Sequence, residues 1–341
     1  MDLLTERSPF RRLAWALVII AVIAAAAAAI GAYEYLGPYR GYGNEKFVEV
    51  ERGMSSRDIA RLLSQKGIVK SPWAFLLVRA VHPRATLQAG EYRFDAAQTP
   101  WQVFDKIRRG DIFYELFTVP EGSNLFDIAA LLRQSDTVRP DAFLKAAADP
   151  QSIRDLDPLA PSLEGYLFPS TYRVTHKTTA RQLCQMMTAE FRKQWAAIGG
   201  LAHQSDTHRM VTLASLVEKE TAVPSERPLV AAVFLNRIER GIPLQCDPTT
   251  IYAALLENRY RGEIHKSDLA STNAYNTYTH SGLPPGPIAN PGLTSLQASL
   301  HPAQTDYLYF VAKPDGSGSH HFSPTLQEHE KAVLALRRAG H

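Results

Sequence analysis

An uninterrupted apolar run near the N-terminus constrains this chain more than any other feature. The run extends from Leu13 to Ala32 and follows three arginines in residues 1–12. A helix of this length rises about 30 Å, which matches the hydrocarbon thickness of a membrane. We therefore expect a transmembrane helix over residues 13–33, with a cytoplasmic tail over residues 1–12 because arginines favour that side.

A cleavable signal peptide is the alternative for this segment, because its alanine tract offers several A-x-A sites. The apolar part of a signal peptide is usually about 7 to 15 residues long, however, and the run is longer. A retained anchor is therefore favoured, and both interpretations export the rest of the chain. The glycine-containing stretch "EYLGPYRGYGNEK" over residues 34–46 is typical of a linker.

Composition allows a large folded body and argues against one class of partner. Of the 341 residues, 45% are apolar, enough for two or three domains with a sizeable core. The 37 basic and 34 acidic residues are scattered, without a basic stripe interleaved with aromatic residues. No nucleic-acid partner is expected.

A repeat lies in the first folded part. "VERGMSSRDIARLL", from Val50, aligns with "VPEGSNLFDIAALL", from Val119. Each copy predicts a strand, a glycine turn, a helix capped by Ser55 or Asn124, and a second helix with proline in its first turn. A return strand ends at Phe94 in the first copy, so a βααβ module is expected over residues 47–113, with a half-repeat at about 116–150.

This order of strand, helix, helix and strand resembles the LysM module, a small sugar-binding fold of bacterial cell-wall proteins. The matched residues are mainly core and turn positions. The repeat is equally consistent with a scaffold that binds nothing.

The stretch "VTLASLVEKETAVPSER", residues 211–227, predicts a helix that is apolar on nearly all sides and therefore buried. It nevertheless carries Glu218 and Glu220, which are about 200° apart on a helix and point to opposite sides. An apolar surround would raise the pKa of Glu218, and small residues one turn earlier leave room beside it. Arg227 or Arg237 would neutralise Glu220.

Turn and cap signals place two further helices after this one. The first is expected from about Glu226 to Arg240, with Ser225 as its cap. Asp247 is expected to cap the helix that follows it, or else to lie in a substrate cleft.

Three long segments carry a resemblance to a known family: "SLEGYLFPSTYRV", "ASLVEKETAVPSERPLVAAVFLNRIERGIPLQCDPTTIYA" and "NAYNTYTHSGLPPGPIANPGLTSLQASLHPAQTDYLYFV". They closely resemble the endolytic murein transglycosylases of the YceG-like family. The resemblance implies an α+β fold, with a mixed α+β catalytic domain over residues 114–341, and assigns the catalytic acid to Glu218. It also implies peptidoglycan glycan strands as substrate, 1,6-anhydro ends as product, no cofactor, and association with peptidoglycan synthases at the inner membrane with a periplasmic body.

The same segments supply candidate cleft residues, with hydroxyl, amide, carboxyl and ring groups suited to sugars. Core packing is an equally good explanation for the tyrosines. The candidates are Glu164, Tyr166, Ser170, Thr171, Tyr172, Gln245, Asp247, Asn273, Tyr275, Asn276 and Tyr278.

Other chemistries find little support in the sequence. His280, His320, His321 and His329 lack the spacing of a zinc site, so no metal is expected. The two cysteines, Cys184 and Cys246, are expected to be buried and unpaired, with a single disulfide as the alternative. A non-catalytic wall-binding adaptor and a hydrolytic muramidase remain the rival functions.

Overall fold

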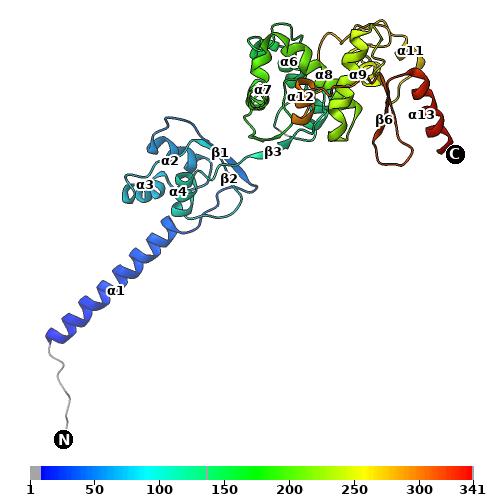
Figure 1. The fold of residues 1–341 in the computed structure, drawn as a ribbon. Coiled ribbons are helices and arrows are strands. Elements are labelled where there is room, and N and C mark those ends of the chain that lie inside the picture. Colours follow the sequence, from blue (N-terminus) through cyan, green and yellow to red (C-terminus); the bar gives the residue numbers. More distant parts are fainter. Residues whose placement is uncertain (1–8, 136, 340–341) are drawn as a thin grey trace. The chain divides into compact units, whose positions relative to one another are not determined.

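The computed structural model describes residues 9–135 and 137–339, and the chain forms two compact units, residues 1–114 and 115–341 (Figure 1). Helices and short antiparallel strands are mixed in both. The α+β class expected from the sequence is confirmed.

The first unit begins with a long helix, α1, Pro9–Leu36. Its stretch Leu13–Leu36 is long and apolar enough to cross a membrane, and its side chains are exposed. The expected apolar helix is present and continues three residues beyond the predicted end at residue 33. Membrane crossing itself remains a prediction.

The βααβ order predicted for the first repeat is present. Strands β1 and β2 pair antiparallel, Ser55 accepts the N–H of Asp58 as a helix cap, and Pro72 begins the second helix. A third helix, α4, follows the return strand and was not anticipated. The likeness to the LysM fold stays a prediction. The elements of this module are β1 Lys46–Val50, α2 Ser56–Gln65, α3 Pro72–Val81, β2 Gly90–Phe94 and α4 Pro100–Arg109.

The second repeat copy opens the second unit but closes differently. Asn124 caps its first helix by accepting the N–H groups of Phe126 and Asp127, as expected from the alignment. Its strand, however, pairs with a strand that comes only after a 3-10 turn and a long loop. The elements are β3 Glu115–Thr118, α5 Leu125–Leu132, α6 Pro140–Ala147, η1 Pro150–Ile153 and β4 Thr171–Val174.

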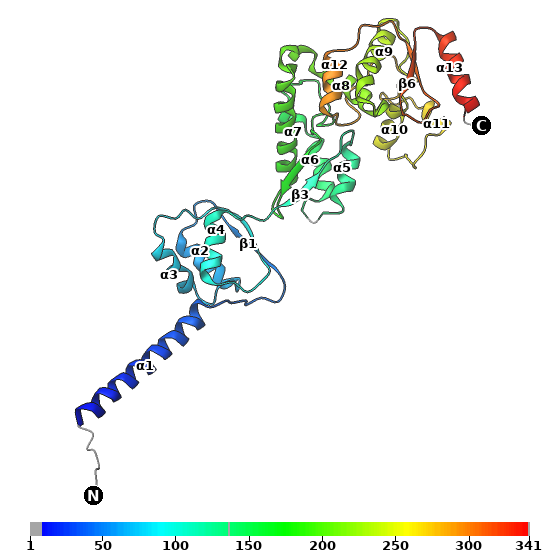
Figure 2. The same ribbon diagram turned by 60° about the horizontal axis from the view of Figure 1, so that its bottom comes forward.

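Helix α8, Thr207–Glu220, lies in the core of the second unit, where every residue from Val211 to Val217 is buried. The predicted buried helix is confirmed. It packs against α9 and α12 (Figure 2). These two helices are separated in the sequence by a long stretch that is mostly irregular. The surrounding elements are α7 Ala180–Ala197, η2 Gly200–Asp206, η3 Pro224–Glu226, α9 Arg227–Glu239, α10 Asp247–Leu256, α11 Lys266–Leu269 and α12 Leu293–Leu300.

The predicted caps of α9 and α10 are wrong. Residues 224–226 form a 3-10 turn that runs directly into α9, so Ser225 lies inside this turn and caps nothing. Asp247 is the first residue of α10 and makes no capping bond, because Cys246 occupies the cap position.

The chain ends in a hairpin and a helix. Strands β5, Tyr309–Ala312, and β6, His320–Ser323, pair antiparallel, and α13, Leu326–Ala339, packs on both (Figure 1). Both cysteines are buried and unpaired, as predicted.

Candidate active site

The C-terminal end of α8 carries two glutamates in different surroundings. Their opposite directions follow from the helix geometry, as the sequence predicted. Of the two arginines predicted as partners of Glu220, Arg227 binds Glu218 instead. Arg237 lies in the same cavity lining as Glu220, and its positive charge acts to lower the pKa of Glu220.

The Glu218 carboxylate is enclosed by donors. Arg227 donates from Nη2 at 3.0 Å, and the backbone N–H of Gly292 donates at 2.9 Å. Only 5% of the Glu218 side chain and 7% of the Arg227 side chain are exposed. Arg227 also donates to the hydroxyl of Thr294. Glu218 therefore ties α8 to α9 and to the start of α12.

The Glu220 carboxylate faces a cavity of about 260 Å³. Burial raises the pKa of Glu220; the neighbouring Cys246 thiol opposes this rise by hydrogen bonding, and the negative charge of Asp247 adds to it. Among the residues that the structure describes, no cation forms an ion pair with Glu220. The lining residues are Glu220, Phe234, Arg237, Leu244, Gln245, Asp247, Tyr278, Phe310 and His329.

Polar groups in this cavity are held in place by other contacts. The Tyr278 hydroxyl donates to Oδ1 of Asp247 at 2.5 Å. Arg237 donates to the carbonyls of Leu308, at 2.7 Å, and Leu244, at 2.8 Å, so backbone groups hold its guanidinium. The φ angle of Gln245 is 51°, a strained value for a residue other than glycine and one that clusters at functional sites.

His329 lines the same cavity from α13, more than a hundred residues away in the sequence. Its ring stacks on Tyr309, with centroids 5.2 Å apart, and its buried Nδ1 has no hydrogen-bond partner. Burial and the positive charge of Arg237 lower the pKa of His329. The sequence analysis considered this histidine only as a metal ligand and missed its place beside Glu220.

Glu164, a predicted cleft residue, is buried at 1% exposure. It accepts hydrogen bonds from the N–H of Leu125, the hydroxyl of Tyr252 and the amide of Asn290. Burial raises the pKa of Glu164 to about 8, although these donors oppose the rise. Glu164 thus joins α5, α10 and the loop before α12.

Asn290 completes this buried junction, and the sequence analysis did not single it out. Its Oδ1 accepts the N–H groups of Gly165 and Leu167, each at 2.9 Å. Its Nδ2 donates to Glu164 and to the carbonyl of Ser123. Because the Gly122–Asn290 backbone pair adjoins Glu218 and Gly292, this junction positions the loops around the end of α8.

Most other predicted cleft residues have structural contacts. Tyr166 is fully buried and donates to Asp157, Tyr172 is 6% exposed and donates to the carbonyl of Phe168, and Asn276 is fully buried. This burial favours core packing, the alternative given for the tyrosines, at Tyr166 and Tyr172, and a substrate role for all three residues stays a prediction. The remaining four also lie outside the cavity lining: Ser170, Thr171, Asn273 and Tyr275.

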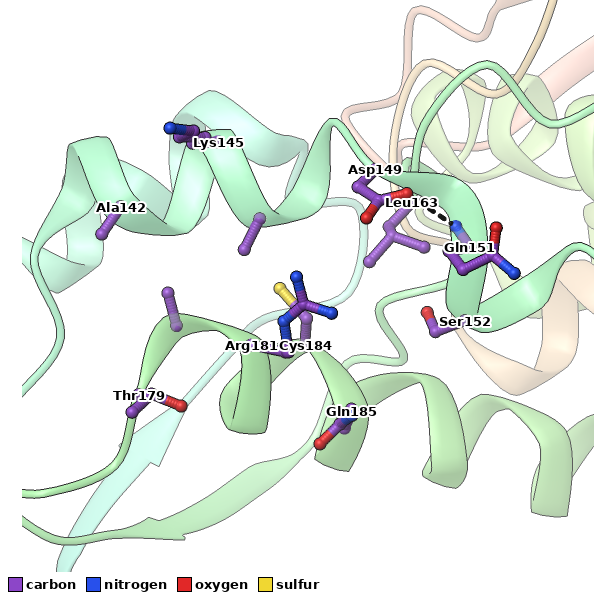
Figure 3. Close-up of a pocket in the computed structure, with 12 residues that line it drawn as sticks. Ala142, Lys145, Asp149, Gln151, Ser152, Leu163, Thr179, Arg181, Cys184 and Gln185 are labelled. Atoms are coloured by element: carbon purple, nitrogen blue, oxygen red, sulfur yellow. Dashed lines mark hydrogen bonds between the residues drawn. The ribbon is translucent and has the colours of Figure 1, made fainter.

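A larger cavity of about 610 Å³ lies between α6, η1 and α7 (Figure 3). Lys145, Arg181 and Gln185 border it, together with the buried Cys184, whose thiol pKa burial raises to about 12. Asp149, its one acidic lining residue, accepts the N–H of Gln151 as a turn cap. The Glu220 cavity is therefore the better candidate for acid catalysis, although it is smaller.

Comparison with known proteins gives the family. The model of the "YceG-like family" matches residues 48–335. This chain belongs to the YceG-like family. The YceG-like match includes both glutamates of α8, the cavity beside Glu220 and His329, and it begins in strand β1 of the first unit.

Curated relatives and a solved structure agree with this assignment. The chain is 31% identical over 312 residues to an endolytic murein transglycosylase of Bacillus subtilis (strain 168), with 84% of this chain and 83% of that protein covered. It is 28% identical over 316 residues to an endolytic murein transglycosylase of Streptococcus pneumoniae (strain D39), of which the match spans 57%. A crystal structure of a YceG-like protein from Listeria monocytogenes matches with a TM-score of 0.56 and 31% identity, covering 85% of this chain and 99% of that one.

Proposed function

We propose that this protein is a membrane-anchored endolytic peptidoglycan lytic transglycosylase, with Glu220 as its catalytic acid. The curated relatives are named endolytic murein transglycosylases, which supports the activity. The assignment of the acid rests on one observation: Glu220 faces a cavity with polar walls and has a raised pKa. Glu218, the acid that the sequence resemblance predicts, stays the rival candidate; it is enclosed and bound to Arg227, and the variants below distinguish the two glutamates.

The chemistry needs an acid that still holds its proton near neutral pH. In the proposed reaction, Glu220 donates this proton to the oxygen of the glycosidic bond between N-acetylmuramic acid and N-acetylglucosamine, and the bond breaks. The resulting carboxylate then accepts the proton of the C6 hydroxyl, whose oxygen attacks C1 of the same sugar. The products are a 1,6-anhydro end and a free 4-hydroxyl end, with no water consumed.

Neighbouring groups support both steps. The negative charge of Asp247 helps Glu220 to keep its proton and would stabilise positive charge that develops on the sugar ring. The guanidinium of Arg237 offers donors to sugar oxygens. The Tyr278 oxygen, whose proton is donated to Asp247, offers an acceptor to a sugar hydroxyl or to the acetamido N–H. Gln245, Asp247 and Tyr278 are thus the members of our predicted cleft set that belong to the proposed substrate site.

The cellular setting follows from the N-terminal helix. We propose that α1 anchors the chain in the inner membrane, with residues 1–12 cytoplasmic and the body periplasmic, and that residues 47–113 form a LysM-like module. Cleavage of new glycan strands there would end their elongation near the synthases. A reporter that is active only in the cytoplasm should be silent when fused after His341, and strong activity there would contradict this topology.

The product of cleavage tests the activity and the acid together. Purified peptidoglycan is digested with the wild-type chain, Glu220→Gln or Glu218→Gln, and the fragments are analysed by mass spectrometry. We expect internal cuts with 1,6-anhydro ends from the wild type, a loss of about 10² to 10⁴ in rate for Glu220→Gln, and retained cleavage by folded Glu218→Gln. Reducing ends would indicate a muramidase, and no cleavage by the wild type would favour the adaptor.

A further inference from the structure

Helix α3 exposes an apolar face on the described part of the first unit. Trp73 is 71% exposed, Leu77 57% and Val81 75%. Residues four apart lie on one side of a helix, so these three form a continuous stripe. The opposite side of α3 carries Ala74 and Phe75, which are buried against the core of the first unit.

The stripe lies close to the end of the apolar helix α1. Nζ of Lys70, two residues before Pro72 begins α3, is 4.0 Å from Oε1 of Glu34 in the last turn of α1. The backbone N–H of Gly41 donates to the carbonyl of Gly67 at 2.9 Å. The five residues that follow Leu36, up to Gly41, can span at most about 18 Å. The loop between α2 and α3, which contains Gly67 and Lys70, is therefore held next to the end of α1.

We propose that the stripe of Trp73, Leu77 and Val81 docks α3 into the surface of the phospholipid bilayer that α1 spans. This inference rests on the proposed anchor. The apolar stretch of α1 ends at Leu36, so Glu34 marks the level of the membrane surface, and Lys70 places the start of α3 at that level. A helix of ten residues is about 15 Å long and can lie along the interface, where tryptophan is enriched.

The charges beside α3 fit anionic headgroups. Arg84 follows the helix and is exposed. Lys70 precedes the helix and is exposed too, but its ammonium group already lies 4.0 Å from Oε1 of Glu34, so Arg84 is the cation available to a headgroup. Cations at the interface attract anionic lipids and would orient the apolar stripe toward the acyl chains. Docking would give the first unit a second contact with the membrane. Two contacts would fix the orientation of this unit relative to the bilayer, whereas a single helix with a linker leaves the unit free to rotate.

Spin labels report the environment of each position directly. The full chain is reconstituted in vesicles of phosphatidylethanolamine and phosphatidylglycerol, with a label on Leu77→Cys, on Ile23→Cys within α1, or on Ser317→Cys in the turn between β5 and β6. The native cysteines are buried, so the unsubstituted chain serves as the blank. Collision of each label with oxygen is compared with collision with a water-soluble nickel chelate.

We expect the labels at Leu77 and Ile23 to collide several-fold more with oxygen than with the nickel chelate, and the label at Ser317 to show the reverse. An apolar signature at Ile23 with an aqueous one at Leu77 would overturn the docking of α3 alone. An aqueous signature at Ile23 would overturn the anchor and the docking together. A Leu77 label that stays mobile in the vesicles and becomes immobilised only when glycan strands are added would show a sugar-binding face. That result would also overturn the inference.

Discussion

Replacing Glu218 by glutamine should damage stability far more than catalysis. The change removes the negative charge beside Arg227, whose side chain is only 7% exposed, so its guanidinium cannot regain water without moving. Removing one partner of a buried ion pair costs about 3 to 5 kcal/mol. Glu121, 4.0 Å from the same Nη2, offsets part of this cost, but only weakly because it is 54% exposed. We therefore expect a loss of about 3 kcal/mol.

Thermal unfolding of the full chain, followed by circular dichroism, measures this loss. A unit of this size shifts by about 2 to 4 °C per kcal/mol, so the midpoint should fall by roughly 6 to 12 °C. Glu220→Gln is the matched control on the same helix, and its midpoint should change little, because burial raises the pKa of Glu220 and its neighbours therefore do not favour the charge that glutamine removes. An unchanged midpoint for Glu218→Gln, together with lost cleavage at a temperature where it is folded, would refute the division of roles and restore Glu218 as the acid.

Three further predictions concern pH and packing. Because Glu220 must be protonated and its pKa is raised, kcat/KM should fall only as pH rises through that raised value, and Asp247→Asn should move this fall to lower pH in a pH–rate profile. Asp157 raises the pKa of His208 by hydrogen bonding, so the stability from this pair is complete below the ordinary histidine pKa and is lost as pH rises through the raised one. His208→Gln should therefore flatten the unfolding midpoint against pH, and an unaltered profile would contradict this role. Asn290→Ala leaves several buried groups unpaired and should cost at least about 3 kcal/mol in denaturant unfolding, whereas a near-wild-type midpoint would show that water replaces the amide.

Local features of this protein could be predicted from the sequence, because they are determined by residues that are close together in the sequence. The apolar run predicted the presence of α1, which extends four residues before and three residues beyond the predicted span, and the repeat alignment predicted the caps at Ser55 and Asn124. The apolar pattern around Val211 predicted a buried α8. Even local reasoning failed where tertiary contacts altered the backbone, as at Ser225, where a 3-10 turn replaces the expected cap.

The surroundings of the two glutamates were decided only by the tertiary structure. Helix geometry in the sequence established that Glu218 and Glu220 point apart, but it could not say which one Arg227 would meet, because that depends on how α9 folds back on α8. His329 reaches the cavity because α13 packs on the terminal hairpin. Patterns within one segment of the sequence cannot predict such contacts. The free energy that selects them comes from burying whole helices against one another and not from the residues of one segment.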